Sequence, residues 1–120
     1  MNPTALKRTW LIAALIALTA SANGSTLIFS PQFDSMIGTT NYSWGSAPNW
    51  VMPDGTQAFR VPLASDSAII TSLVDAGGYG IRVQNLVLTN NAAVSNGTFS
   101  VLSLQMLSAS SFQNAAVKAA

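Results

Sequence analysis

Hydrophobic and polar residues alternate along the C-terminal part of the chain, and the same alternation occurs twice. Residues 80–97 align with residues 98–115 without a gap, at an offset of 18 positions. Five apolar pairs and one asparagine pair coincide: Ile81 with Phe99, Val83 with Val101, Leu86 with Leu104, Leu88 with Met106, Val94 with Phe112, and Asn96 with Asn114. Alternation at period two places such side chains on one face of a strand. A short repeat of this kind is typical of a chain coiled into stacked turns.

A competing pattern lies inside the first copy. Asn96-Gly97 stands between apolar residues and is typical of a two-residue turn, which predicts an antiparallel hairpin. The match with Asn114 favours the coil instead, because stacked turns would bring the two amides together as a ladder. We therefore expect an all-β protein, a short right-handed parallel β-helix (β-solenoid) with an aromatic-rich N-terminal cap. The alternative is an antiparallel β-sandwich.

The N-terminus has the pattern of an export signal. A basic pair precedes the uncharged apolar run Trp10–Leu18, and the small residues 20–22 follow it. This order predicts a signal peptide over residues 1–22, cleaved between Ala22 and Asn23. The apolar run is about half of the roughly 20 residues that a membrane span needs. We expect a secreted, extracellular or cell-surface protein without a stable membrane span once the signal is removed.

The rest of the chain divides into three parts. Residues 23–79 are expected to form an N-terminal strand and the aromatic cap region, residues 80–115 two 18-residue turns of the coil, and residues 116–120 a tail. That tail would form a helical turn or begin a third coil turn. Within the cap region, Pro53-Asp54-Gly55 predicts a tight turn. The apolar run from Ser67 to Val74 predicts one strand.

Composition narrows the functional classes. Beyond the signal the chain has three cations and four aspartates, a net charge of −1, whereas the whole chain carries +1. So few cations make nucleic acid a poor partner. There is no histidine, cysteine or glutamate. Serine–histidine catalysis and a cysteine nucleophile are thereby excluded, and zinc binding is disfavoured. We expect a protein that is not an enzyme and has no cofactor.

A few residues remain as candidate binding groups. Trp44 and Trp50 would stack on sugar rings while Asn49 bonds sugar hydroxyls, a candidate carbohydrate site. Asp66, with loop carbonyls, is a calcium candidate. In each case a structural role is favoured: the tryptophans would pack over the end of the coil, and the aspartate would close a turn.

The segment Tyr42–Ile70 resembles the start of a module in bacterial exported β-helix proteins. These are the autotransporter-associated repeat proteins and the surface proteins with a C-terminal sorting signal. The matching elements are Trp44, Asn49-Trp50, Gly55, Pro62 and Asp66-Ser67-Ala68-Ile69. The resemblance implies a structural or adhesive role outside the cell and supplies no catalytic residues. Those proteins run for many turns, so this chain is expected to be a truncated or small member.

The expected function is that of an exported structural or adhesion β-solenoid without catalysis. The expected partners are further copies of the chain or a larger β-helix assembly, and in addition cell-surface polysaccharide. Two alternatives remain open: a polysaccharide-binding module, and a remnant of a β-helix polysaccharide-degrading enzyme.

Overall fold

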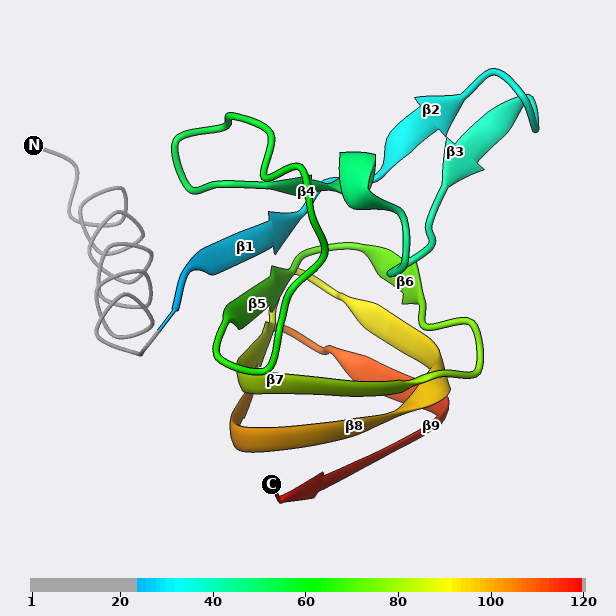
Figure 1. The fold of residues 1–120 in the computed structure, drawn as a ribbon. Helices are drawn as coiled ribbons and strands as arrows, with labels where there is room; N and C mark the ends of the chain where they lie inside the picture. The colour runs from blue at the N-terminus through cyan, green and yellow to red at the C-terminus, as the bar shows by residue number, and fades with distance from the viewer. Residues whose placement is uncertain (1–23, 120) are drawn as a thin grey trace, which may run out of the picture.

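The computed structural model describes residues 24–119, which are almost entirely strands and connecting turns (Figure 1). The predicted signal peptide over residues 1–22 and its cleavage between Ala22 and Asn23 lie outside the described residues. The elements in chain order are β1 (Thr26–Phe29), β2 (Gln32–Asp34), β3 (Thr39–Asn41), the 3-10 turn η1 (Ala47–Asn49), β4 (Trp50–Val51), β5 (Ser67–Ile70), β6 (Leu73–Asp75), β7 (Gly80–Leu88), β8 (Ala93–Met106) and β9 (Ser111–Ala119). Over the described range, no helix has the length and hydropathy needed to cross a bilayer.

The strands form one large mixed sheet and one small hairpin. The large sheet has the order β4-β1-β5-β7-β8-β6, and β9 pairs with β8 beside that path. Its pairs are parallel except for β1 with β4, while β2 and β3 form a separate antiparallel pair. The expected all-β class is confirmed.

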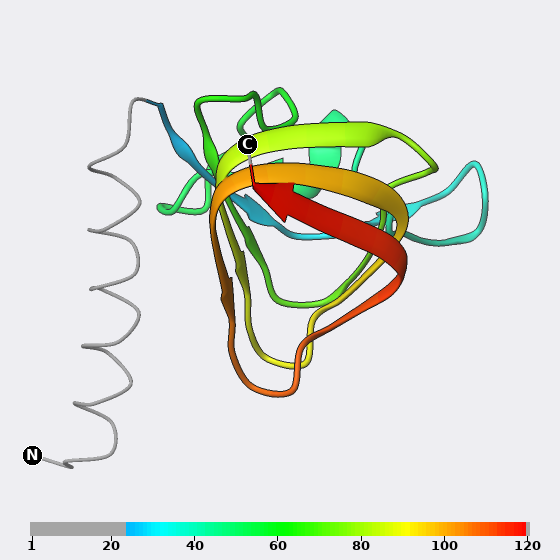
Figure 2. The same ribbon diagram turned by 90° about the horizontal axis from the view of Figure 1, so that it is seen from below.

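Parallel pairing follows the offset of the sequence repeat. Gly80 lies opposite Thr98, and the pairs continue to Leu88 opposite Met106, so β7 and β8 pair at an offset of 18. The same offset joins β5 to β7 and β8 to β9. All five apolar pairs predicted from the repeat are Cα partners in these registers. Figure 2 shows the chain passing repeatedly around a three-sided outline.

The alternative hairpin at Asn96-Gly97 is absent, because β8 runs through both residues and pairs in parallel with β7 and with β9. A type I′ turn needs positive φ at both central residues. Here Asn96 has φ 59°, and Gly97 is not among the residues with positive φ. The glycine serves close packing instead, since a Cβ there would lie 2.4 Å from the Cβ of Ala76. The chain bends at a corner without reversing, so the antiparallel sandwich does not form.

The single strand expected from Ser67 to Val74 is also wrong. A corner at residues 71–72 separates β5, which pairs with β1 and β7, from β6, which pairs with β8. At β6 the offset becomes 20, with Leu73 opposite Ala93. It returns to 18 at Gly80, because the corner at residues 76–79 is longer than its counterpart at 96–97. Each turn of the chain thus keeps its total length while its corners differ.

The interior of the three-sided outline is apolar. Inward-facing residues of β5 to β8 meet the aromatic cap region, and all of the following are buried: Leu27, Phe29, Trp44, Trp50, Ala68, Ile70, Val74, Ala76, Val83, Leu86, Leu88, Ala92, Val94, Phe99 and Val101. Residues 116–119, expected as a tail, are the end of β9 and pair with β8. The turn predicted at Pro53-Asp54-Gly55 is present, with φ 90° at Gly55.

Candidate functional site

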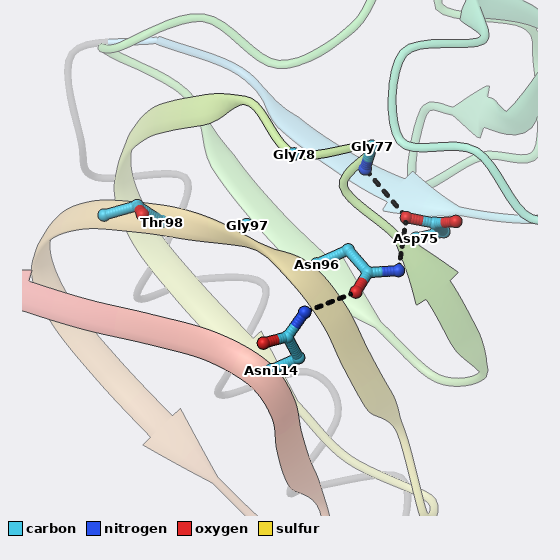
Figure 3. A pocket seen from close by; sticks show the side chains of 7 residues that line it. All are labelled: Asp75, Gly77, Gly78, Asn96, Gly97, Thr98 and Asn114. Carbon is cyan, nitrogen blue, oxygen red and sulfur yellow. Dashed lines mark hydrogen bonds between the residues drawn. The ribbon is translucent and has the colours of Figure 1, made fainter.

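A ladder of polar side chains crosses three turns of the chain at one corner. Asn114 Nδ2 donates to Asn96 Oδ1 at 3.0 Å, as the sequence match predicted. Asn96 Nδ2 in turn donates to Asp75 Oδ1 at a longer 3.4 Å. The same Asp75 oxygen accepts the backbone N–H of Gly77 at 2.8 Å (Figure 3). Asp75 was not predicted, because it precedes Asn96 by 21 positions and not by the repeat offset.

A shallow cavity of about 480 Å³ lies along this ladder. Its lining residues are Asp75, Gly77, Gly78, Asn96, Gly97, Thr98 and Asn114. Gly77 and Gly78 have φ of 70° and 84°, the left-handed region in which glycine is free of the Cβ penalty. The three glycines leave this surface without side chains, so backbone and ladder groups border the cavity directly. No tryptophan and no lysine or arginine is among the residues that line the cavity.

Two hydrogen-bond acceptors of the ladder take no part in the bonds drawn in Figure 3. The ladder uses one Asp75 oxygen and the Nδ2 of Asn114. The second Asp75 oxygen and the Asn114 Oδ1 are therefore free of these bonds. Acceptors of this type bind hydroxyl or amide donors.

A second ladder joins the same turns on another side. Asn85 Nδ2 donates to Ser67 Oγ at 2.9 Å, and Ser103 Oγ donates to Asn85 Oδ1. These residues are Cα partners at the repeat offset. Sequence reasoning missed this ladder because serine and asparagine do not look alike in an alignment. Polar residues recurring at positions 67, 85 and 103 were the signal that could have found it.

The predicted carbohydrate site is inside the protein. Trp44 is 4% exposed, Trp50 0% and Asn49 1%. Trp50 Nε1 donates to the Trp44 carbonyl at 2.8 Å. Asn49 Oδ1 accepts the Gln32 N–H at 2.9 Å, and its Nδ2 donates to the carbonyls of Asn41 and Ser43. Because the two rings are buried and the polar atoms of Trp50 and Asn49 are bonded, these residues cannot stack on a sugar ring in this structure.

The carboxylate of the calcium candidate, Asp66, already has hydrogen-bond and ion-pair partners within the protein. Asp66 is 2% exposed, forms an ion pair with Arg60, and accepts the backbone N–H groups of Leu63 at 2.7 Å and Ser25 at 2.9 Å. Burial raises the pKa of Asp66, but these donors outweigh it and hold the pKa below its ordinary value. No group of three or more potential metal-ligating His, Cys, Asp or Glu residues occurs in the described part of the chain. Asp66 is therefore an anchor between segments.

The last described turn exposes residues that the previous turn buries. Leu86 and Leu88 are 0% exposed, while their partners Leu104 and Met106 are 37% and 43% exposed. Residues 103–106 pair with β7 on one side only, and β9 pairs with β8 on one side only, as far as the described residues extend. Lys118 is the sole ionisable side chain from residue 93 to residue 119. The surface formed by residues 102–119, which we call the open end, exposes Leu104 and Met106 and carries one ionisable side chain, Lys118.

Comparison of the chain with family models, with curated proteins and with solved structures found no match. The resemblance of Tyr42–Ile70 to exported β-helix modules therefore stays a prediction from its motifs. Three of the residues that carry the resemblance, Trp44, Trp50 and Asp66, are buried.

Proposed function

We propose that the chain is an exported cell-surface or extracellular structural or adhesion protein, built as a short right-handed β-solenoid, and that it acts by assembly and not by catalysis. One observation carries the proposal: β7, β8 and β9 stack in parallel at a constant offset of 18 residues. Stacked turns of this kind build rods and surfaces, because each turn makes its contacts with its immediate neighbours.

The side-chain ladders support the solenoid interpretation. Asp75, Asn96 and Asn114 join successive turns at one corner, and Ser67, Asn85 and Ser103 do so on another side. Stacked amides satisfy one another along the stacking direction, as in cross-β assemblies. Two independent ladders, each joining three successive turns, favour a coil of stacked turns.

The chemistry of the chain supports a role without catalysis. The sequence contains no histidine, cysteine or glutamate to act as base or nucleophile. Asp66 is bound by Arg60 and two backbone N–H groups, which leaves it poorly placed for acid–base work. The same bonds remove the support for a remnant of a calcium-dependent polysaccharide-degrading enzyme. The apolar signal pattern of residues 1–22 supports export.

Export and adhesion can be tested together in a bacterial host. We expect the full chain to leave the cytoplasm, to begin at Asn23 by N-terminal mass spectrometry, and to raise cell aggregation or attachment. Leu15→Arg is the control, because a charge inside the apolar run should block export and abolish both effects. Retention of the uncleaved chain in the cytoplasm, or export without any change in attachment, would contradict the proposal.

The cavity beside Asp75 favours a second candidate function, a polysaccharide-binding module. Its glycine-bounded surface and free acceptors suit sugar hydroxyls. If it binds polysaccharide, Thr98→Trp should fill the cavity and reduce retention in affinity electrophoresis by roughly tenfold or more, the loss of one good set of contacts. Ser100→Trp is the matched control, because Ser100 lies two positions along the same strand and does not line the cavity. Equal retention of both variants would reject this candidate.

A further inference from the structure

We infer that the open end docks against the open end of a second copy of the chain, tail to tail, to form a closed dimer. This inference rests on the proposed function and identifies the partner in assembly as a second copy of the chain. Figure 1 shows β4 and β1 at one end of the coil and β9 at the other. At the first end β4 covers the edge of β1, whereas at the second end β9 pairs on one side only. This difference determines which ends can meet.

The open end has apolar surface that further packing would cover. Leu104 and Met106 occupy the inward positions that are fully buried one turn earlier, as Leu86 and Leu88. Phe112 and Val117 are only partly buried against the core. Covering such side chains stabilises a complex in proportion to the apolar area removed from water.

The strand edges of the open end suit a second copy. Residues 103–106 lie on one side of the three-sided outline in Figure 2. The two parts of β9, before and after Asn114, lie on the other two sides. A two-fold axis perpendicular to the coil reverses the direction of each partner strand, so the edges would meet antiparallel and pair their backbone N–H and C=O groups. The amide of Asn114, at the end of its ladder, offers both a donor and an acceptor and is therefore self-complementary.

Charge and size also fit a second copy. Lys118 is the only ionisable side chain from residue 93 to residue 119, so two open ends meet with little like-charge repulsion. The turn from Leu102 to Ala119 offers 18 residues. That number approaches the roughly 20–30 residues per partner of a standard protein interface.

The opposite end explains why association would stop at two copies. There β4 pairs antiparallel with the edge of β1, and the cap residues Trp44 and Trp50 are buried. A head-to-tail contact would need this end to be open, and repeated contacts of that kind would build a filament. With one end covered by β4, a tail-to-tail contact pairs the two open ends with each other and closes the assembly.

Sedimentation of the purified chain over a wide concentration range tests the dimer. We expect a monomer–dimer equilibrium without larger species. Leu104→Lys combined with Met106→Lys should weaken dimerisation by roughly a hundredfold or more, because two charges per copy would be buried. Gln113→Lys is the matched control, since it adds a charge to the same turn at an exposed position facing away from the core, and should leave the dimer unchanged. A wild-type monomer at every concentration, or growth beyond the dimer, overturns the inference.

Two further measurements keep the result clear if the double variant unfolds. In the wild-type chain, amide hydrogen exchange in β9 should slow as concentration rises. Because the sequence has no cysteine, spin labels on Gln113→Cys and on Met36→Cys report single positions. Gln113 labels should be close in the dimer, and Met36 labels in the β2–β3 hairpin should be far apart. A monomer that is exported and still promotes attachment would reject the dimer alone, whereas a dimer that stays in the cytoplasm would reject the proposed function alone.

Discussion

Replacing Trp50 by alanine is expected to cost about 3–5 kcal/mol in the free energy of unfolding, the range for large-to-small changes in a core. Trp50 is fully buried, with its ring centroid 4.7 Å from that of Trp44 and 5.1 Å from that of Phe29. Trp44 extends the cluster to Phe99 of the coil at 5.4 Å. Removing the ring of Trp50 would leave a cavity between Phe29 and Trp44 and loosen the support of the Trp44 ring that packs on Phe99. Urea or thermal denaturation measures the loss.

Trp50→Phe is the matched control for this prediction. It keeps an aromatic ring in the cluster and removes the Nε1 donor that binds the Trp44 carbonyl. We expect a smaller loss, about 1–3 kcal/mol, because a buried carbonyl loses its partner while much of the packing remains. If Trp50→Ala kept its stability and instead lost binding to a polysaccharide, the packing role would be refuted and the carbohydrate site predicted from the sequence would be restored.

The sequence repeat predicted the stacking of turns for a physical reason. Parallel strands in register place equivalent residues above one another, so an inward position in one turn stays inward in the next. Val83 above Val101 and Leu86 above Leu104 follow this rule. The Asn96–Asn114 bond follows it as well. Side-chain periodicity was therefore enough to predict the register and one rung of the ladder.

The corners could not be predicted in this way. The corner at residues 71–72 has two residues, and its counterpart at 89–92 has four, so the offset changes locally to 20. An alignment at constant offset cannot place Asp75 beside Asn96, because the longer corner at 89–92 has shifted the offset to 20 and set Asp75 opposite Ser95. The constant-offset alignment therefore predicted the Asn96–Asn114 bond but not the glycine-bounded cavity beside Asp75.

Stacking also overrides local preference at these corners. Asn90, Asn91 and Asn96 have positive φ, and one turn later Ser108, Ala109 and Asn114 have the same sign of φ. Asparagine tolerates this region, whereas for alanine it costs roughly 1–2 kcal/mol. The backbone of the later turn is held by the earlier one, as in the bond from the Asn91 N–H to the Ser108 carbonyl at 2.9 Å. Local turn signals, including Asn96-Gly97, were misleading because the neighbouring turn decides the conformation.

Asp66→Ala is expected to cost about 2–4 kcal/mol, because it leaves two backbone donors and one cation without their acceptor. The carboxylate joins three places in the sequence: Ser25 before β1, Arg60 in the loop after β4, and Leu63 just before β5. Arg60 is partly exposed and can turn to water, which keeps the cost below that of a fully buried ion pair. Chemical denaturation at neutral pH measures the loss.

The same carboxylate should make stability depend on pH in a defined direction. Burial opposes ionisation of Asp66, but the bonds from Arg60, Leu63 and Ser25 hold its pKa in the folded state below its ordinary value. A group with a lowered folded pKa adds stability that is complete above the unfolded pKa of about 3.9 and is lost as pH falls through the folded pKa. We therefore expect the wild-type chain to lose stability below about pH 4.

Asp66→Asn removes this titration and should flatten the acid limb of the pH profile, although it begins from a lower stability. Asp54→Asn is the matched control. The bonds from the Thr56 side chain and backbone lower the pKa of Asp54 as well, but its carboxylate is exposed and joins only its own turn. Its profile should therefore change much less than that of Asp66→Asn. An acid limb unchanged in Asp66→Asn would refute the anchoring role, and calcium-dependent stabilisation of the wild-type chain that disappears in this variant would restore Asp66 as a metal ligand.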